Sequence, residues 1–171
     1  MVAETGWQPG IIHFLNPWFR VGYSYGSGDS DPNDGRHGTF FQVLPTPRPY
    51  ARFPFYNMMN NEDFLASSMF RLPHSFVFRS DLHALRLANA RDFWYGGGGA
   101  FQPHTFGYTG RSTGGNRGLA SVWDLSMDVP LRYGFTLTTY YAYACGKSAV
   151  ASIYRSDSNA QFGYVETNFH F

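Results

Sequence analysis

Hydrophobic and polar residues alternate with a period of two along most of the chain. In the segment 18–25, Phe19, Val21, Tyr23 and Tyr25 share one face, and the residues between them fall on the other. The same alternation recurs in the segments 62–72, 75–84, 119–129, 131–145 and 161–171, and more weakly in 11–15. This period is typical of β-strands that have one apolar and one polar face, and helical periodicity is nearly absent. The pattern therefore predicts an all-β fold of about seven strands.

The connections between these segments alternate between tight and long. Proline residues at Pro17, Pro73 and Pro130 mark breaks that leave room only for hairpin turns. The remaining connections run over 26–61, 89–118 and 146–160. Most strands have close to the roughly 9–11 residues that cross a bilayer when tilted. Short turns on one side and long loops on the other are typical of a bacterial outer-membrane barrel, so we predict a single antiparallel transmembrane β-barrel domain.

A soluble β-sandwich would produce the same alternation, because each of its sheets buries one face and exposes the other. Two features favour the barrel. Aromatic residues line one face of many strands, and loops as long as these are rare in compact soluble domains. The opposite face carries charged residues that a water-filled lumen would solvate, whereas an arginine facing lipid at the midplane costs about 2–4 kcal/mol.

The composition supports a membrane-embedded β-protein over several other classes. Charged residues make up 15% and aromatic residues 19% of the chain, and the mean hydropathy is −0.31. So many aromatic residues exclude a disordered tail, and the lack of any run of about 18 apolar residues excludes a helical membrane protein. The formal net charge of +1 gives no reason to expect nucleic acid as a partner.

Arginine is the most informative charged residue type. Lys147 is the only lysine among the 13 residues of the Lys and Arg group, and arginine holds carboxylates bidentately where lysine does not. Rings of arginine in a narrow water-filled pore attract carboxylated polymers. The candidate pore-lining residues, which share the polar faces of the strands, are Arg20, Arg71, Arg79, Asp81, His83, Asp124, Asp128 and Arg132. The candidate constriction residues, in or beside the long loops, are Arg48, Arg52, Arg86, Arg91 and Arg111. The alternative is that these arginines pair with wall carboxylates, such as Glu166, and only stabilise the barrel.

An acidic loop offers the one weak candidate for a metal site. Asp29, Asp31 and Asp34 could supply oxygen ligands, but Asp34 and Phe40 stand where a calcium-binding loop of the EF-hand type needs Gly and Glu. We therefore expect these carboxylates to accept hydrogen bonds from turn amides and to pair with loop arginines.

Other motifs for cofactor binding or catalysis are absent from the sequence. His37, His83 and His104 do not have zinc-ligand spacing. The glycine run 96–99 is not followed by the Lys and Ser/Thr of a phosphate loop, and no nucleophile elbow is present. We predict no cofactor, no resident metal and no enzymatic activity.

Four segments carry a family resemblance: SGDSDPNDGRHGTFFQVLPTPRPYARFPFYNMMNNEDF (27–64), SDLHALRLA (80–88), DFWYGGGGAFQ (92–102) and FGYTGRS (106–112). Their order and spacing resemble the C-terminal part of the alginate-export family of outer-membrane barrels, from about Pro17 onward. The resemblance implies a large closed barrel that moves anionic exopolysaccharide or other solutes across the outer membrane.

The two ends of the chain suggest how much of a barrel it contains. The chain ends on Phe171 in an alternating strand, which looks like the signal by which the barrel-assembly machinery recognises outer-membrane barrels. The first ten residues lack the features of a signal peptide. About seven strands cannot close a barrel, since single-chain bacterial barrels have even strand numbers and an open edge is not tolerated in lipid. We therefore expect residues 1–171 to be the C-terminal portion of one barrel domain, with the signal peptide lying outside this chain.

The predicted function is the passage of an alginate-like anionic polysaccharide, or of smaller anions, through an arginine-lined lumen surrounded by outer-membrane lipid. We expect the loop 26–61 to fold over or into the pore, because its apolar residues need packing partners. These are Phe40, Phe41, Val43, Leu44, Phe53, Phe55 and Tyr56. Two alternatives stay open: an outer-membrane barrel with an adhesion or scaffold role, and a soluble β-sandwich binding module.

Overall fold

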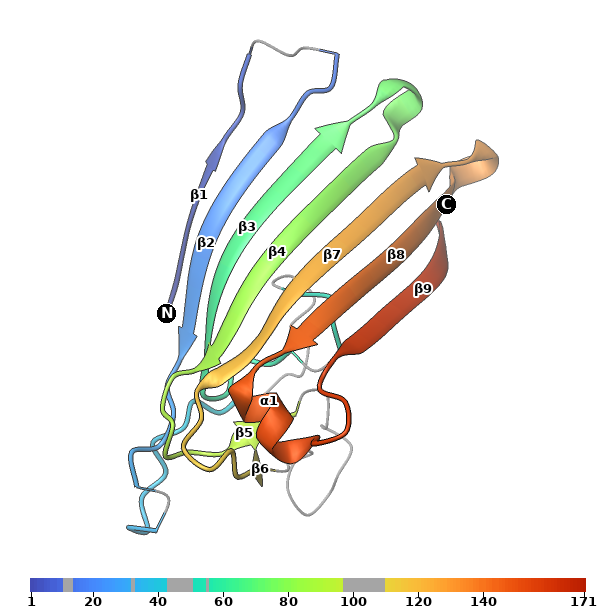
Figure 1. Cartoon of the computed structure of the whole chain (residues 1–171). Coiled ribbons are helices and arrows are strands. Elements are labelled where there is room, and N and C mark those ends of the chain that lie inside the picture. Colours follow the sequence, from blue (N-terminus) through green and yellow to red (C-terminus); the bar gives the residue numbers. More distant parts are fainter. Residues whose placement is uncertain (11–13, 32, 43–50, 55, 97–109) are drawn as a thin grey trace.

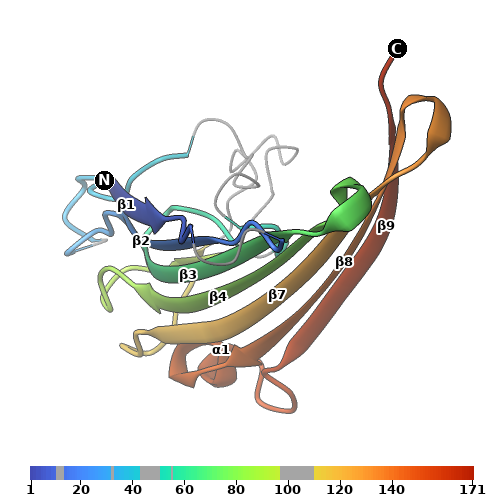
Figure 2. The same ribbon diagram turned by 90° about the horizontal axis from the view of Figure 1, so that it is seen from above.

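One curved antiparallel sheet of seven strands makes up most of the molecule, with the strand order β1-β2-β3-β4-β7-β8-β9 (Figure 1). The computed structural model describes residues 1–10, 14–31, 33–42, 51–54, 56–96 and 110–171. The strands are β1 (Val2–Trp7), β2 (Trp18–Gly26), β3 (Asn61–Arg71), β4 (Val77–Leu87), β7 (Gly118–Pro130), β8 (Phe135–Gly146) and β9 (Ala160–Phe169). Seen from above, the sheet curls around a concave face and does not close (Figure 2).

This architecture confirms the predicted all-β, antiparallel, partial-barrel fold. A β-sandwich needs two large sheets packed face to face. The described residues instead form the seven-stranded sheet and a two-stranded sheet of β5 (Trp94–Tyr95) and β6 (Gly110–Arg111). The sandwich alternative is therefore wrong.

The first strand lies earlier in the chain than the sequence pattern predicts. We expected a weak strand over 11–15, but residues 14 and 15 form a turn and residues 11–13 lie outside the described part. β1 occupies Val2–Trp7, where alternation is poor, and it pairs with β2 from Val2 opposite Ser24 to Trp7 opposite Phe19. Pairing of its backbone with a strongly alternating neighbour, rather than its own pattern, makes this segment a strand.

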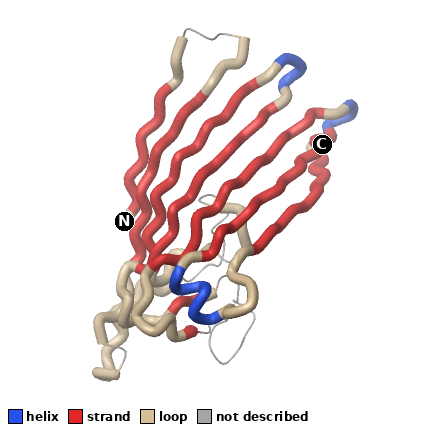
Figure 3. The backbone as a smooth tube through the Cα atoms, in the orientation of Figure 1, coloured by secondary structure: helices blue, strands red, loops and turns tan. Residues whose placement is uncertain are grey.

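The connections separate to the two ends of the sheet, as the sequence predicts (Figure 3). At one end, the 3-10 turns η1 (Pro73–Ser75) and η2 (Arg132–Gly134) join β3 to β4 and β7 to β8. The described parts of the long connections lie at the other end, and the last of these connections contains the short helix α1 (Ser148–Ile153). Among the described residues, no helix has the length and apolar content that a membrane crossing requires.

The two faces of the sheet differ as the alternation predicts. Residues directly opposite each other in neighbouring strands share a face, so His83 lies between Leu65 and Val122 on the concave side. The convex side carries large apolar side chains that are exposed. These are Phe19, Val21, Phe64, Leu82, Trp123, Tyr141, Tyr143 and Val165.

A buried apolar core lies between the long loops and the concave face. Loop residues Ala51, Phe53 and Tyr56 join Leu85 of β4 and Val122 of β7 in one cluster. Burying a side chain as large as Phe53, Leu85 or Val122 contributes roughly 1.5–3 kcal/mol. Of the other apolar loop residues, Phe40 and Phe41 are exposed. Val43, Leu44 and Phe55 lie outside the described residues.

Candidate functional site

A polar hollow of about 560 Å³ opens on the concave face, between Arg52 of the long loop and the strands β4, β7, β8 and β9. Two arginines and two acids line it, Arg52, Arg79, Asp128 and Glu166, together with hydroxyl, amide and imidazole side chains of β8, β9 and the segment that follows β9. This hollow is where the concave wall presents charged groups to solvent.

The two arginines of the hollow come from distant parts of the chain. Arg79 lies on β4, opposite Met69 of β3 and Ser126 of β7, on the concave side. Arg52 lies in the long loop between the buried residues Ala51 and Phe53, so the loop core fixes the backbone on both sides of it. Its Nη1 atom is buried and has no hydrogen-bond partner among the residues that the structure describes. The predicted wall residue and the predicted loop residue therefore meet at one site.

The acids of the hollow are held in the wall. The Thr138 hydroxyl donates to Asp128 Oδ1 over 2.7 Å, between the paired strands β7 and β8. Glu166 lies opposite Thr138 on β9, so it faces the same side. The hollow therefore carries both signs of charge rather than a purely basic surface.

A buried polar cluster lies beside the hollow, around His83. The ring Nδ1 of His83 is 2.8 Å from Asp63 Oδ2, and its Nε2 is 3.6 Å from Asp124 Oδ2. The Tyr140 hydroxyl donates to the other oxygen of Asp124, Oδ1, over 2.8 Å. Asp81, on the same face, accepts a hydrogen bond from the Ser67 hydroxyl. Four strands, β3, β4, β7 and β8, thus contribute to one cluster.

A match to a known protein family covers most of the residues described above. A family model described as alginate export matches residues 3–144. The chain belongs to the alginate export family. No curated protein and no solved structure matches the chain.

The alginate export match spans β1 to β7 and most of β8, and therefore includes Arg52, Arg79 and the cluster around His83. The resemblance inferred from the sequence is confirmed. The family is one of outer-membrane transport proteins, not of enzymes.

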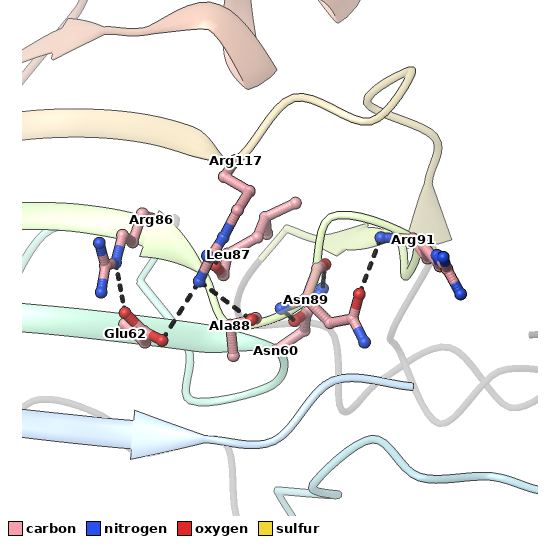
Figure 4. Close-up of polar contacts among 8 residues, drawn as sticks. All are labelled: Asn60, Glu62, Arg86, Leu87, Ala88, Asn89, Arg91 and Arg117. Carbon is pink, nitrogen blue, oxygen red and sulfur yellow. Dashed lines mark hydrogen bonds and ion pairs between the residues drawn. The ribbon is translucent and has the colours of Figure 1, made fainter. Parts of the chain in front are cut away.

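In this member of the alginate export family, the predicted constriction residue Arg86 and a further arginine, Arg117, brace the long-loop end of the sheet (Figure 4). Arg86 and Arg117 both contact the buried carboxylate of Glu62, with Arg117 Nη2 at 3.3 Å from Glu62 Oε1. Arg117 also donates to the carbonyl oxygens of Leu87 and Ala88, over 2.9 and 3.0 Å. Arg86 faces the convex side, because its cross-strand partner is Glu62 and its guanidinium lies over the exposed ring of Phe64.

Asn60 connects the same region to the following loop (Figure 4). This fully buried side chain donates to the carbonyl oxygens of Asn89 and Phe93, both over 3.0 Å, and accepts from the Asn89 amide over 2.7 Å. The backbone amide of Arg91 then donates to Asn89 Oδ1 over 3.0 Å, and Arg91 is exposed.

The remaining predicted arginines are scattered. Arg20 lies on the concave side of β2, 3.5 Å from Glu4 of β1. Arg71 and Arg132 are exposed near the short turns. Arg111 of β6 donates to the Tyr154 hydroxyl over 2.7 Å. Arg48 lies outside the described residues.

The acidic loop forms turns, as the sequence predicts. Asp29 accepts hydrogen bonds from the backbone amides of Asp31 and Gly38, over 3.0 and 3.2 Å. These two N–H groups hold the pKa of Asp29 below its usual value, the Asp31 amide having the larger effect. Asp31 and Asp34 each accept from the backbone amide two residues further on, from Asn33 and Arg36.

The buried carboxylate of Asp92 connects two loops through hydrogen bonds. Its oxygens accept from the Asp29 amide and the Thr39 hydroxyl, over 2.8 and 2.6 Å, and from the Tyr95 hydroxyl over 2.9 Å. Burial, reinforced by this bond to Asp92, raises the pKa of Tyr95 to about 12. Asp92 could not be chosen from the sequence, because no neighbouring residue indicates that it contacts residues more than fifty positions away.

Sequence reasoning also missed Asp63 and Tyr140 in the cluster around His83. Both have a detectable signal, since each lies at a concave position of a predicted strand. Asp63 has the parity of Leu65 and Ser67, and Tyr140 has the parity of Thr138. Both lie inside the predicted segments 62–72 and 131–145, so following the alternation through every position of these segments would have placed them on the polar face.

Proposed function

We propose that the chain conducts an anionic polysaccharide of the alginate type across the outer membrane, along its concave face. The observation that carries this proposal is the convergence of Arg52 and Arg79 on one solvent-open hollow. A uronate polymer carries one carboxylate on each sugar, and a guanidinium binds a carboxylate through two parallel hydrogen bonds. Arg52 and Arg79 both line the hollow, so their guanidinium groups can donate to such a carboxylate.

The other lining residues suit the rest of a sugar. Hydroxyl and amide groups of Thr136, Thr138 and Asn168 can exchange hydrogen bonds with sugar hydroxyls, and Asp128 and Glu166 can accept from them. Conduction requires a site that binds strongly enough to admit the polymer and weakly enough to release it. Acids next to the arginines reduce the net positive charge and so keep the binding weak.

The proposed setting is the outer membrane, with lipid against the convex face. The apolar side chains exposed there, such as Trp123 at 50% and Val165 at 70%, would be covered by acyl chains. We further propose that Phe171 is recognised by the barrel-assembly machinery during insertion. Both proposals rest on family membership and on the polarity of the two faces.

A channel-block titration tests the role of the hollow. Full-length protein containing this chain is placed in a planar bilayer and titrated with short oligouronates, and their block of the current gives an affinity. Arg79→Gln and Arg52→Gln should each weaken block about five-fold, equivalent to roughly 1 kcal/mol for a half-exposed charged contact. Arg86→Gln, on the convex face, is the matched control and should leave block unchanged.

Two results would contradict the proposal. One is equal block of the wild-type protein by neutral oligosaccharides of the same length, which would remove the role of carboxylates. The other is an equal effect of all three arginine substitutions, which would indicate a general effect of charge or stability.

The loop core supports a second candidate, a barrel with an adhesion or scaffold role. Phe53 and Tyr56 fill space against the concave face that a polymer would otherwise occupy. A protein that inserts stably into bilayers but conducts no ions would favour this candidate over a channel.

A further inference from the structure

Three metal-binding side chains meet on the concave face, at the centre of the cluster around His83. Asp81 and His83 lie two positions apart on β4, and Asp124 lies directly opposite Asp81 on β7. One ligand atom from each residue can be chosen so that all three lie within 4.8 Å of one another. His83 and Asp124 are buried, and Asp81 is half-buried. The register of two strands that are separated by a long loop therefore builds this triad.

The ring of His83 leaves one nitrogen without a hydrogen bond. Its side chain is 1% exposed, and Nε2 has no hydrogen-bond partner among the described residues. The carboxylate oxygen Asp124 Oδ2 lies 3.6 Å away, which is beyond hydrogen-bond range. A buried polar atom without a partner costs about 1–3 kcal/mol, so its environment needs an explanation.

The other atoms of these side chains are held by neighbours. Nδ1 of His83 is 2.8 Å from Asp63 Oδ2, and Asp124 Oδ1 accepts from the Tyr140 hydroxyl over 2.8 Å. Asp81 Oδ1 accepts from the Ser67 hydroxyl. A proton on Nδ1, shared with a carboxylate, leaves the Nε2 lone pair free. This arrangement, in which each ligand is fixed by a second group, is the one that metal sites use to orient their ligands.

The charges around His83 also do not balance. Asp63, Asp81 and Asp124 place three carboxylates around one imidazole. A protonated imidazole and the guanidinium of Arg52, which is close enough to act electrostatically on Asp124, would together compensate two of the three negative charges. Buried charges that lack compensation are strongly destabilising. A divalent cation between Nε2 and the free carboxylate oxygens would compensate two of them, and Arg52 the third.

We propose that Asp81, His83 and Asp124 bind a divalent transition-metal ion, with Zn²⁺ as the best fit. Ligands about 2.0–2.2 Å from a tetrahedral zinc ion lie about 3.4 Å apart. The distance of 3.6 Å between His83 Nε2 and Asp124 Oδ2 is close to this value, and a carboxylate oxygen of Asp81 lies within 4.8 Å of both atoms. An imidazole ligand favours zinc and its neighbours over Ca²⁺ and Mg²⁺, which prefer oxygen alone.

Such an ion would fasten β4 to β7 and, through Asp63, to β3. The half-buried Asp81 gives access from the solvent side and leaves the fourth position to water. This proposal departs from the expectation that the chain holds no metal, which rested on sequence spacing alone. It does not depend on the transport proposal, because none of its ligands lines the hollow.

A cobalt titration tests the site directly. Full-length protein, purified in detergent and stripped with a chelator, is titrated with Co²⁺ while its visible absorption is recorded. We expect one equivalent to give the intense bands of a tetrahedral site, and Zn²⁺ to remove them. His83→Gln and Asp124→Asn should abolish the bands, and Asp63→Asn should weaken Co²⁺ binding about 10–100-fold. His74→Gln, at an exposed histidine of η1, is the control and should bind as wild type does.

Two outcomes would overturn the proposal. One is no saturable Co²⁺ binding to folded wild-type protein, which would identify His83 as an imidazolium between carboxylates. The other is identical binding by wild type and His83→Gln. Heat-modifiable migration on gels establishes that each variant is folded. If His83→Gln does not fold, Asp63→Asn and Asp124→Asn still decide the question.

Discussion

The hydroxyl of Tyr140 on β8 donates to Asp124 on β7 over 2.8 Å, and both side chains are buried on the concave face. The next residue, Tyr141, faces the other side of the same strand, where its exposed hydroxyl donates to Gln161 over 3.0 Å. Two adjacent tyrosines thus donate hydrogen bonds of similar length, one of them buried and the other exposed.

This contrast predicts different costs for the same substitution. Tyr140→Phe leaves a buried carboxylate with one partner fewer and should lower the free energy of unfolding by about 1–3 kcal/mol. Tyr141→Phe removes an exposed bond and should change it by less than about 0.5 kcal/mol. Urea denaturation in detergent micelles measures both. Equal losses of unfolding free energy in the two variants would mean that the hydrogen bond from Tyr140 does not stabilise the buried carboxylate of Asp124.

Phe53 anchors the long loop in the core against the concave face. It is 5% exposed, whereas Phe40 in the same loop is 44% exposed. Phe53→Ala should cost about 3–5 kcal/mol of loop packing, and the freed loop should be cleaved faster by protease. Phe40→Ala should be cleaved at the wild-type rate. If Phe53→Ala left the cleavage rate unchanged, the core would not hold the loop.

Glu62 joins two arginines at the long-loop end, with its side chain 8% exposed and theirs close to half exposed. Glu62→Gln should lower the free energy of unfolding by about 1–2 kcal/mol, a value below that of a fully buried pair because water screens the arginines. Glu4→Gln, at a carboxylate that is 33% exposed and has Arg20 as its partner, should cost less than about 1 kcal/mol. A larger loss for Glu4→Gln would contradict this ranking.

The turn at Asp29 should open in acid. The amides of Asp31 and Gly38 hold the pKa of Asp29 below its ordinary value of 3.8. A carboxyl whose folded pKa is lowered stabilises the fold above its unfolded pKa, and that stabilisation is lost as the pH falls through the folded pKa. We expect amide exchange at Asp31 and Gly38, corrected for its intrinsic pH dependence, to accelerate in that range.

Substitution distinguishes this acid transition from general unfolding. Asp29→Asn should show fast exchange at every pH and no acid transition. Asp34→Asn, at an exposed carboxylate in the same loop, should keep the transition. Persistence of the transition in Asp29→Asn would assign it to another group.

The fold was predictable because the period of a strand is two, and parity then assigns each residue to a face. Phe19, Leu65 and Trp123 fall on the predicted faces for this reason. The assignment of residues to faces was wrong where the predicted strand ended too early. Ending the strand at Ala84 made Arg86 a loop residue, whereas β4 continues to Leu87 and places Arg86 on the convex face.

The candidate site was only partly predictable, because it depends on contacts between distant segments. Alternation put Arg79, Asp81, His83 and Asp124 on one side, but only the strand register brings the last three together. The position of Arg52 depends on the packing of the long loop, which has no periodic signal. The two-residue strands β5 and β6 and the six-residue helix α1 are too short to produce one.

The ion selectivity of the open channel tests the central claim most directly. Full-length protein in a planar bilayer separates two solutions of unequal KCl concentration, and the reversal potential gives the ratio of anion to cation permeability. We predict a preference for anions that falls in the double variant Arg52→Gln/Arg79→Gln and is kept in Arg86→Gln. A preference for cations in the wild-type protein would contradict the account of an arginine-lined conduit.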